Sequence, residues 1–216
     1  MRYLKVGQVP AKADPEAQKI FLEDQLQKRI DEAEKGERNL LFCDASHFVM
    51  GAYLGNVWCR NRVFIKVPCG RQRFNVLGAY NPILNELTTV TNDSYINSLS
   101  VEELLEKIRA DYNISAPTTP ITIVLDNASY QRCDYVKVAA ERLNIELLFL
   151  PTYSPNLNLI ERLWRFVKKE CLNSKYHATF KVFKAAISNC LDGLNSKYTK
   201  QMDSLMTLKF QVLQAL

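Results

Sequence analysis

Alternating apolar and polar runs predict a series of strands in the first half of the chain. Short apolar segments with turn residues between them occur at 40–46 (LLFCDAS), 51–59 (GAYLGNVWC), 62–67 (RVFIKV), 74–80 (FNVLGAY) and 85–92 (NELTTVTN). Together these segments indicate a meander of strands. Two later apolar runs, ITIVLD at 121–126 and ELLFLP at 146–151, are typical of buried strands.

Helical periodicity fills the remaining segments. A polar, charged helix is predicted over 14–36 and ends at Gly36, while Ser100-Val-Glu-Glu is a capping-box pattern that opens a helix reaching about Asp111. Further helices are predicted at 132–143, 156–171, 177–192 and 200–214. Because strands alternate with helices after the meander, the pattern predicts an α/β layered fold with a mixed sheet. We expect residues 1–37 to form a helical arm, 38–195 the α/β domain and 196–216 a helical tail.

Composition excludes several classes of protein. Hydrophobic residues make up 47% of the chain and charged residues 24%, which is typical of a folded domain. No apolar run reaches the length of a membrane span and the first residues lack a signal-peptide pattern, so we expect a cytoplasmic protein that does not enter a membrane. The six cysteines form no C-x-x-C pair and only two histidines accompany them, which argues against a zinc site and against a disulfide framework. Buried free thiols are expected instead.

Positive charge is concentrated in two segments. Residues 161–216 carry ten Lys/Arg against four Asp/Glu, and a second basic run without intervening acids contains Arg60, Arg62, Lys66, Arg71 and Arg73. A polyanion is one partner that such segments would bind. A solvated basic face explains the same charge, so the pattern alone does not decide.

Two aspartates follow the most strand-like apolar runs. Asp44 comes directly after LLFC, and Asp126 directly after ITIVL. Burying such a carboxylate requires a partner or a cation, and open α/β sheets place their sites beyond the carboxyl ends of strands. Either aspartate taken alone could equally be a turn former or a helix cap.

A third carboxylate, Glu161, lies at the edge of a buried helical stripe. The stripe consists of apolar residues at three- and four-residue steps, and it includes Trp164, which we interpret as a core residue. A local explanation also exists for Glu161, since Asn158 and Glu161 match a capping box and Arg165 stands four residues on. All three carboxylates together, converging from strand ends and a helix, would suit magnesium, which prefers oxygen ligands.

The segments around these acids resemble the three signature blocks of DDE transposases. The blocks are LLFCDASHF, VLDNASYQ and LPTYSPNLNLIERLWRFVKK, and 34 residues separate Asp126 from Glu161. This spacing is similar to that of the insertion sequence 630 branch of the mariner-like superfamily, and the last block is the most specific. The resemblance covers roughly residues 38–190. Leu159 stands where the family usually has Pro, a change that costs little at a first helical position.

The resemblance implies a ribonuclease-H-like fold, with a mixed five-stranded sheet flanked by helices, and makes 38–195 a DDE catalytic domain. It implies an enzyme that cleaves DNA at transposon ends and transfers the freed strand into target DNA. Two magnesium ions, or manganese as a substitute, would be held by Asp44, shared between both ions, and by Asp126 and Glu161. Expected partners are transposon-end and target DNA and a second copy of the chain, in a prokaryotic, nucleoid-associated location.

Other residues are assigned supporting roles. Asn127 and Asn158 are candidates to orient the metal ligands, although turn and cap roles explain them equally well. His47 and Tyr153 are expected near the site without an assigned role. Expected phosphate contacts are Arg60, Arg62, Lys66, Arg71, Arg73, Arg165, Lys168 and Lys169.

Full-length relatives carry helix-turn-helix segments before the catalytic part, and nothing upstream of Asp44 is long enough for them. We therefore expect a catalytic half, with a separately encoded DNA-binding half as a possible partner. Two alternatives stay open: a ribonuclease-H-like nuclease that cleaves without joining strands, and an inactive remnant that only binds nucleic acid.

Overall fold

Five strands form a mixed sheet at the centre of the described structure. A computed structural model describes residues 11–54, 58–61, 63–66, 71–115 and 118–212. The strands lie in the order β3-β2-β1-β4-β5, and they span β1 Asn39–Val49, β2 Arg73–Asn81, β3 Glu86–Asn92, β4 Ile121–Leu125 and β5 Ile145–Phe149. β1, β2 and β3 are antiparallel neighbours, whereas β4 and β5 run parallel to β1. This is the mixed sheet that the pattern predicts, with the five strands that the resemblance to DDE transposases implies.

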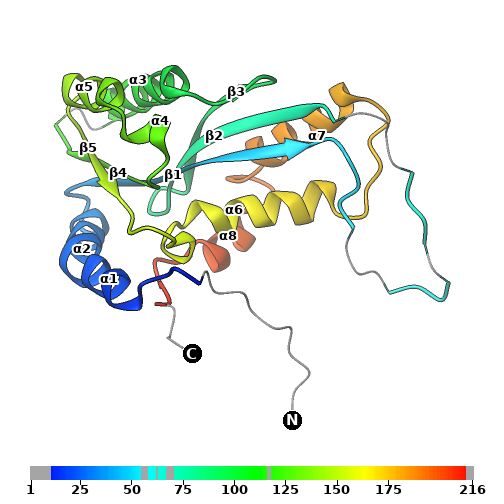
Figure 1. The fold of residues 1–216 in the computed structure, drawn as a ribbon, viewed down its shortest axis with the longest axis horizontal. Helices are drawn as coiled ribbons and strands as arrows, with labels where there is room; N and C mark the ends of the chain where they lie inside the picture. Colours follow the sequence, from blue (N-terminus) through cyan, green and yellow to red (C-terminus); the bar gives the residue numbers. More distant parts are fainter. Residues whose placement is uncertain (1–10, 55–57, 62, 67–70, 116–117, 213–216) are drawn as a thin grey trace, which may run out of the picture.

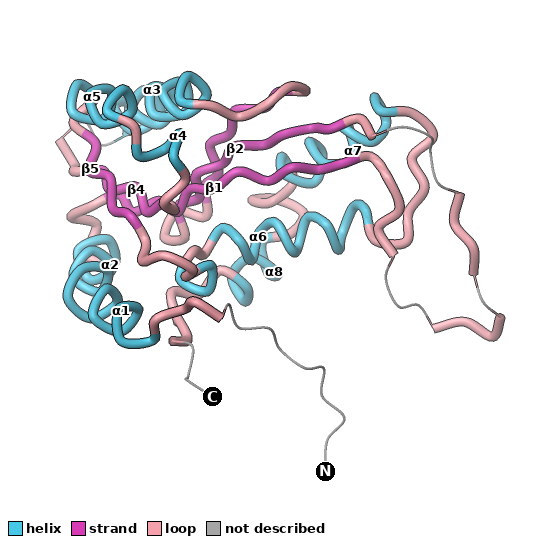
Figure 2. The backbone as a smooth tube through the Cα atoms, viewed as in Figure 1, coloured by secondary structure: helices cyan, strands magenta, loops and turns pink. Residues whose placement is uncertain are grey.

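Helices cover both faces of the sheet, and this explains the apolar runs (Figures 1 and 2). All five residues of β4 are buried because each of its faces packs against a helical layer. Along β1, Leu40 and Phe42 point into one core, while Leu41 and Cys43 point into the other. The period-two alternation of a strand therefore divides its side chains between two hydrophobic cores.

One face is covered by α3 Ser98–Ser115 and α5 Asp134–Arg142, with the short helix α4 Ser129–Arg132 beside them. Leu104, Leu105 and Ile108 of α3 are fully buried in this core, as the predicted helical stripe requires. The helix begins earlier than predicted. Asn97, rather than Ser100, is its capping residue: the Asn97 side chain accepts from Ser100 N at 3.1 Å.

The opposite face is covered by segments from both ends of the chain. They are α1 Pro15–Ile20, η1 Phe21–Leu26 and α2 Gln27–Glu34 before the sheet, and η2 Pro155–Leu157, α6 Ile160–Val167, η3 Lys168–Leu172, α7 Phe180–Asp192 and α8 Thr199–Leu205 after it. Residues of the arm, the α/β domain and the tail share one hydrophobic core on this face. No helix among the described residues is both long and apolar enough to cross a membrane.

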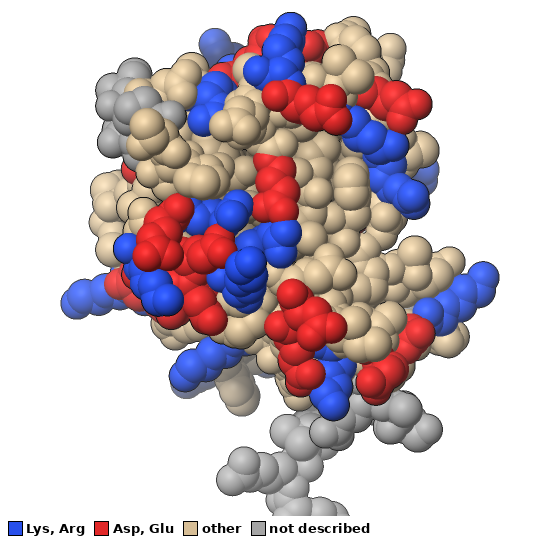
Figure 3. Space-filling view, turned by 90° about the vertical axis from the view of Figure 1, so that its left-hand side faces the viewer, with Lys and Arg blue, Asp and Glu red and all other residues tan. Residues whose placement is uncertain are grey.

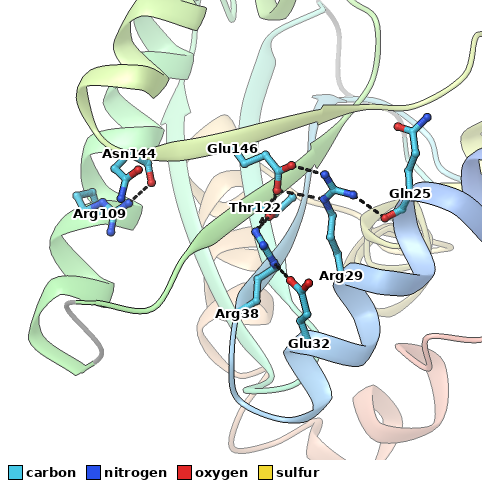
Figure 4. A network of polar contacts seen from close by, with 8 residues as sticks. All are labelled: Gln25, Arg29, Glu32, Arg38, Arg109, Thr122, Asn144 and Glu146. Atoms are coloured by element: carbon cyan, nitrogen blue, oxygen red, sulfur yellow. Dashed lines mark hydrogen bonds and ion pairs between the residues drawn. The ribbon is translucent and has the colours of Figure 1, made fainter.

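A network of charged groups joins the N-terminal arm to the sheet (Figure 4). Arg29 of α2 donates to both carboxylate oxygens of Glu146 on β5. Arg38 donates to Glu146 at 3.0 Å and also pairs with Glu32, so that it joins α2 to the sheet. Thr122 of β4 donates to the same Glu146 at 2.6 Å. The arm is therefore held at the β4–β5 edge by polar contacts as well as by its apolar stripe.

The segment between β1 and β2 differs from the predicted meander. The described residues of 51–59 and 62–67 form no strand, and they extend beyond the end of the sheet (Figure 1). Leu54 and Trp58 are largely exposed, so the sheet and its helices do not cover these described apolar residues. A run of apolar residues becomes a strand only where a partner strand and a covering layer are available.

The C-terminal tail also departs from the prediction. Helix α8 ends at Leu205, whereas the sequence predicts helix to 214; the described residues after it, to 212, are not helical. Arg162 of α6 accounts for the difference. Its guanidinium donates to the backbone carbonyls of Leu205, Thr207 and Lys209 and so holds the segment after α8 against α6 in a non-helical path.

Candidate active site

A cavity of about 310 Å³ opens where β1, β4 and the start of α6 meet. Asp44, Asp126 and Glu161, the three acids singled out from the sequence, all line it. The remaining wall comes mostly from the segment that links β5 to α6, and the lining is completed by Asn127, Ala128, Leu150, Pro151, Thr152, Tyr153, Ser154, Pro155 and Asn158.

The sheet register explains why Asp44 and Asp126 meet. Asp44 does not end its strand, as the sequence suggests, because β1 continues to Val49 as a partner of β2. The parallel pairing of β1 with β4, however, stops at Phe42 and Val124. Each aspartate stands two residues beyond this last pair, and both point to the face covered by α6. Asp44 therefore lies at the end of a strand pairing rather than at the end of a strand.

Asp44 is held in an environment that disfavours its charge. Burial raises the pKa of Asp44 to about 7, and the nearby carboxylates of Glu161 and Asp126 add to the rise. The backbone N–H of Ala45 and the side chain of Trp164 act in the opposite direction. The fold thus disfavours the charged form of Asp44 despite these two groups.

Glu161 occupies the first turn of α6, and its pKa is also affected by burial and by the neighbouring Asp126. Burial raises the pKa of Glu161, as does Asp126, whereas Lys168 and Arg165 act to lower it. The predicted local roles of Glu161 are not realised. Helix α6 has no side-chain cap, and within the described residues neither Glu161 nor the two aspartates form an ion pair.

The donor set suits a hard divalent cation. Three carboxylates from separate rigid elements supply oxygen ligands. A divalent cation bound between them would neutralise their negative charge and so relieve their mutual repulsion. Among the described residues, no three His, Cys, Asp or Glu side chains are gathered tightly enough to enclose one ion by themselves. Carboxylate oxygens suit ions that complete their coordination with water and substrate oxygens, as magnesium commonly does.

Asn158 and Asn127 support the cavity by contacts that the sequence does not reveal. The buried side chain of Asn158 donates to the carbonyl of Cys43, next to Asp44, at 3.0 Å. Its amide oxygen has no partner among the described residues. Asn127 donates to the carbonyl of Leu150 and so joins the ends of β4 and β5. Asn158 is thus bonded to β1, the strand that carries Asp44, rather than acting as a helix cap.

Gln131 is a supporting residue that sequence reasoning missed. This fully buried side chain lies on α4, and with its amide oriented so that both ends are satisfied, the nitrogen donates to the backbone oxygen of Asp126 at 3.1 Å and to its Oδ1 at 2.5 Å. The backbone N–H of Ala128 also donates to Oδ1 of Asp126, at 3.0 Å, so two donors hold this carboxylate in place. The sequence offers no local signal for this role, because α4 spans only the four residues Ser129–Arg132.

Tyr153 stands half-exposed at the cavity, with the left-handed backbone conformation φ 58°. The ammonium nitrogen of Lys12 lies over its ring, 5.9 Å from the ring centroid. Left-handed backbone in a bulky residue is strained, and such strain is concentrated at functional sites. His47 instead contacts Asn75 at 2.7 Å and is not among the cavity residues.

The predicted phosphate contacts fall in two regions. Arg165 and Lys168 lie near Glu161, as their effect on its pKa requires, and Lys169 is exposed on η3. Arg60, Lys66, Arg71 and Arg73 are exposed beyond or at the far end of the β1–β2 pair, and Arg62 lies outside the described residues. By contrast, the arm-side end of the molecule shows acidic and basic side chains interspersed (Figure 3).

The cysteines follow the prediction in part. Cys43, Cys171 and Cys190 are buried free thiols, but Cys59 is exposed and Cys133 partly exposed. Cys69 lies outside the described residues.

Comparisons with known proteins agree with this architecture. The sequence profile described as "DDE superfamily endonuclease" matches residues 39–184. A paired-end complex of Mos1 transposase with the left transposon end superposes with a TM-score of 0.65 at 14% identity, covering 97% of this chain and 68% of that one. The catalytic domain of Mos1 mariner transposase superposes with a TM-score of 0.56 at 13% identity, covering 96% and 100%. No significant match occurs among curated protein sequences. The fold is ribonuclease-H-like.

Proposed function

Because the chain belongs to the DDE superfamily of endonucleases, we propose that it is the catalytic part of a DNA transposase. The proposed reaction is cleavage of a phosphodiester at each transposon end, followed by transfer of the freed strand into target DNA. One observation carries the proposal: Asp44, Asp126 and Glu161 converge on one cavity from two strands and a helix. No cation of the described residues pairs with them.

The three carboxylates would hold two magnesium or manganese ions, with Asp44 shared by both and Asp126 and Glu161 each bound to one. When bound, such ions lower the barrier of phosphodiester displacement by activating the attacking oxygen and stabilising the leaving one. The chain itself supplies placement. Two donors fix the position of Asp126, Gln131 through its side chain and Ala128 through its backbone. Asn158 fixes the backbone of β1 directly before Asp44.

DNA is the proposed partner, bound through phosphate contacts. Arg165 and Lys168 stand close enough to Glu161 to influence its pKa, so a phosphate contacted by these side chains would lie beside the cavity. Arg60, Lys66, Arg71 and Arg73 would extend the contact along the duplex. Binding through such residues depends on salt and little on sequence.

Finer assignments rest on the sequence blocks. The 34 residues between Asp126 and Glu161 support the insertion sequence 630 branch, and with it a prokaryotic, nucleoid-associated enzyme. Handling two transposon ends in one reaction supports a homodimer. A separately encoded helix-turn-helix half would supply the recognition of the transposon ends.

The direct test is nicking of supercoiled DNA in the presence of magnesium or manganese. We expect metal-dependent nicking by the wild type and none by Asp126→Ala. Asp134→Asn is the matched control, because Asp134 lies on α5 with a fully exposed side chain that pairs only with Lys137. Equal activity of wild type and Asp126→Ala would contradict the proposal.

A second assay separates the transposase from a simple nuclease. The protein is given pre-cut DNA ends with a free 3′-hydroxyl, and joined products are sought. Joining that requires Asp126 supports the transposase; nicking without joining indicates a nuclease. Binding of DNA with neither reaction indicates a catalytically inactive remnant.

A further inference from the structure

Trp164 occupies a position that packing alone does not explain. It lies one helical turn beyond Glu161 on α6, and only 1% of its surface is exposed. Its ring packs edge-to-face against Phe48 of β1, with centroids 6.2 Å apart and planes at 83°. The indole thus lies between the helix that carries Glu161 and the strand that carries Asp44.

The strand beneath Trp164 is shaped for close approach of the ring. Gly78 of β2 is the register partner of Asp44 on β1. A Cβ at position 78 would lie 2.9 Å from Cη2 of Trp164 and 3.3 Å from Cδ1 of Ile160, which is too close for any residue other than glycine. The missing side chain therefore lets the indole lie against the backbone beside Asp44.

The indole N–H has no hydrogen-bond partner among the described residues, although it is buried. A buried tryptophan N–H usually finds an acceptor, because leaving it unpaired costs stability. Asp44 is the acid beside it, because the indole ring lies against Gly78, the register partner of Asp44 on the neighbouring strand. An unpaired donor and a carboxylate acceptor therefore stand next to each other.

We infer that Trp164 is a positioning residue for Asp44: its indole N–H hydrogen-bonds the Asp44 carboxylate when that carboxylate binds a divalent ion, and Gly78 provides the space. This inference rests on the proposed function. It also explains why a donor stands here rather than the N–H-free ring of a phenylalanine. Outer-shell hydrogen bonds of this kind fix the orientation of a ligand and commonly change metal affinity by about 10- to 100-fold.

The indole N–H can be observed directly by NMR of the ¹⁵N-labelled protein. The chain has two tryptophans, and Trp58 is fully exposed, so Trp58→Phe leaves one indole signal and assigns it to Trp164. Addition of Mg²⁺ alone is expected to move this signal downfield and to slow its exchange with solvent. In Asp44→Asn the same addition is expected to leave the signal in place. A wild-type signal that does not respond, while calorimetry detects bound Mg²⁺, would overturn the inference.

Metal affinity gives a second readout, measured by calorimetry with Mn²⁺. Trp164→Phe removes the N–H and keeps an aromatic ring, and we expect it to weaken Mn²⁺ binding about tenfold. Phe48→Leu is the matched control, since it disturbs the same ring packing without touching the N–H. We expect Phe48→Leu to bind Mn²⁺ as tightly as the wild type.

The outcomes separate the two proposals. Equal Mn²⁺ affinity in Trp164→Phe and wild type, or equal weakening by Phe48→Leu, would show a packing role only and overturn the inference while leaving the proposed function intact. Failure of the wild type to bind Mn²⁺ or Mg²⁺ at all would overturn the proposed function and the inference together. If Trp164→Phe does not fold, the NMR signal of the wild-type side chain decides.

Discussion

The two faces of the sheet differ in how the hydrogen-bonding groups near them are satisfied. On the α3–α5 face, a buried polar contact is satisfied: Asn81 donates to the hydroxyl of Tyr112 at 3.0 Å within an otherwise apolar core. On the α6 face, three buried polar atoms close to the site have no partner among the described residues, namely Ser46 Oγ, Asn158 Oδ1 and Trp164 Nε1. Asp44 lies on this second face, where burial and the neighbouring acids raise its pKa to about 7. Unpaired polar groups and a disfavoured charge therefore gather around the candidate site, as expected where function rather than stability selects the residues.

The faces also differ in how the chain supplies them. Strands and helices from the middle of the sequence, between β1 and β5, build the α3–α5 core. The α6 core combines residues of the N-terminal arm, the α6–α7 region and the tail, such as Leu26, Trp164 and Met202. Segments that are remote in sequence therefore share the core on the face of the candidate site. The experiments below test whether stability and function divide between the faces in the same way.

The largest effect on stability is expected on the α3–α5 face. Leu104→Ala truncates a fully buried side chain of α3 and should lower the free energy of unfolding by about 2–5 kcal/mol, because it leaves a cavity in a closed apolar core. Chemical denaturation measures the loss. Mn²⁺ affinity of the folded variant, measured by calorimetry, should equal that of the wild type. A folded variant with lost metal affinity would show that the two faces are not independent.

On the α6 face, removing a charge should stabilise the metal-free protein. Asp44→Asn eliminates a buried carboxylate whose pKa is raised from 3.8 to about 7, a difference equivalent to at most about 4 kcal/mol. A raised pKa means that the fold favours the protonated acid. The wild type therefore has this stability below pH 4 and loses it as the pH rises through 7.

The advantage of Asp44→Asn should accordingly be absent at pH 4 and full above pH 7, measured as melting temperature in the presence of a chelator. With excess Mg²⁺ the order should reverse, because the ion stabilises only the wild type. A melting temperature of Asp44→Asn below that of the wild type at pH 8 without metal would contradict the idea that this face retains uncompensated charge.

The sequence reveals the candidate site better than the packing around it. Asp126 follows an apolar run that becomes β4, whereas Glu161 stands out only through the resemblance of its block to DDE transposases, because its local pattern equally suits a capping box. Asp44 is also found, although the sequence does not show that its strand continues to Val49. The alternation of polar and apolar residues is weak at the end of this strand, in His47, Phe48 and Val49. Local periodicity is sufficient for these elements because each buries its own apolar residues.

The missing parts depend on contacts between remote segments. The role of Gly78 follows from its register opposite Asp44 and from the ring of Trp164, neither of which spacing along the chain reveals. The end of α8 depends on Arg162, more than 40 residues earlier. In 51–67 the opposite error occurs, since apolar residues such as Trp58 suggest strands where the described residues have no covering layer. The pattern of apolar residues predicts which side chains a segment can bury. It does not predict whether another part of the protein is present to cover them.

Gln131 links the two faces, and its removal should have a smaller effect. It lies on α4, beside α3 and α5, yet its amide holds Asp126 of the site. Gln131→Leu should weaken Mn²⁺ binding about tenfold and lower the free energy of unfolding by only about 1 kcal/mol. Calorimetry and denaturation measure the two quantities. Gln131→Glu, which keeps the shape but removes the donor and adds repulsion, should weaken Mn²⁺ binding more than the leucine does; equal binding by all three proteins would remove Gln131 from the site.

The smallest effect is expected where the arm meets the sheet edge, away from both cores. Glu146→Gln weakens the pairs with Arg29 and Arg38, and because the carboxylate is partly exposed the loss should be about 1 kcal/mol and should decrease at high salt. The hydrogen bond from Arg29 is the main cause that lowers the pKa of Glu146.

A lowered pKa means that the contribution of Glu146 is present above its usual value of 4.5 and is lost as the pH falls below it. The difference in melting temperature between wild type and Glu146→Gln should therefore be clear at pH 7 and vanish near pH 3. Mn²⁺ affinity should be unchanged, because the network contacts none of the three site carboxylates. If Glu146→Gln instead weakened Mn²⁺ binding, the arm would have to influence the candidate site through the core that it shares with α6. Stability and metal binding would then not divide between the two faces of the sheet.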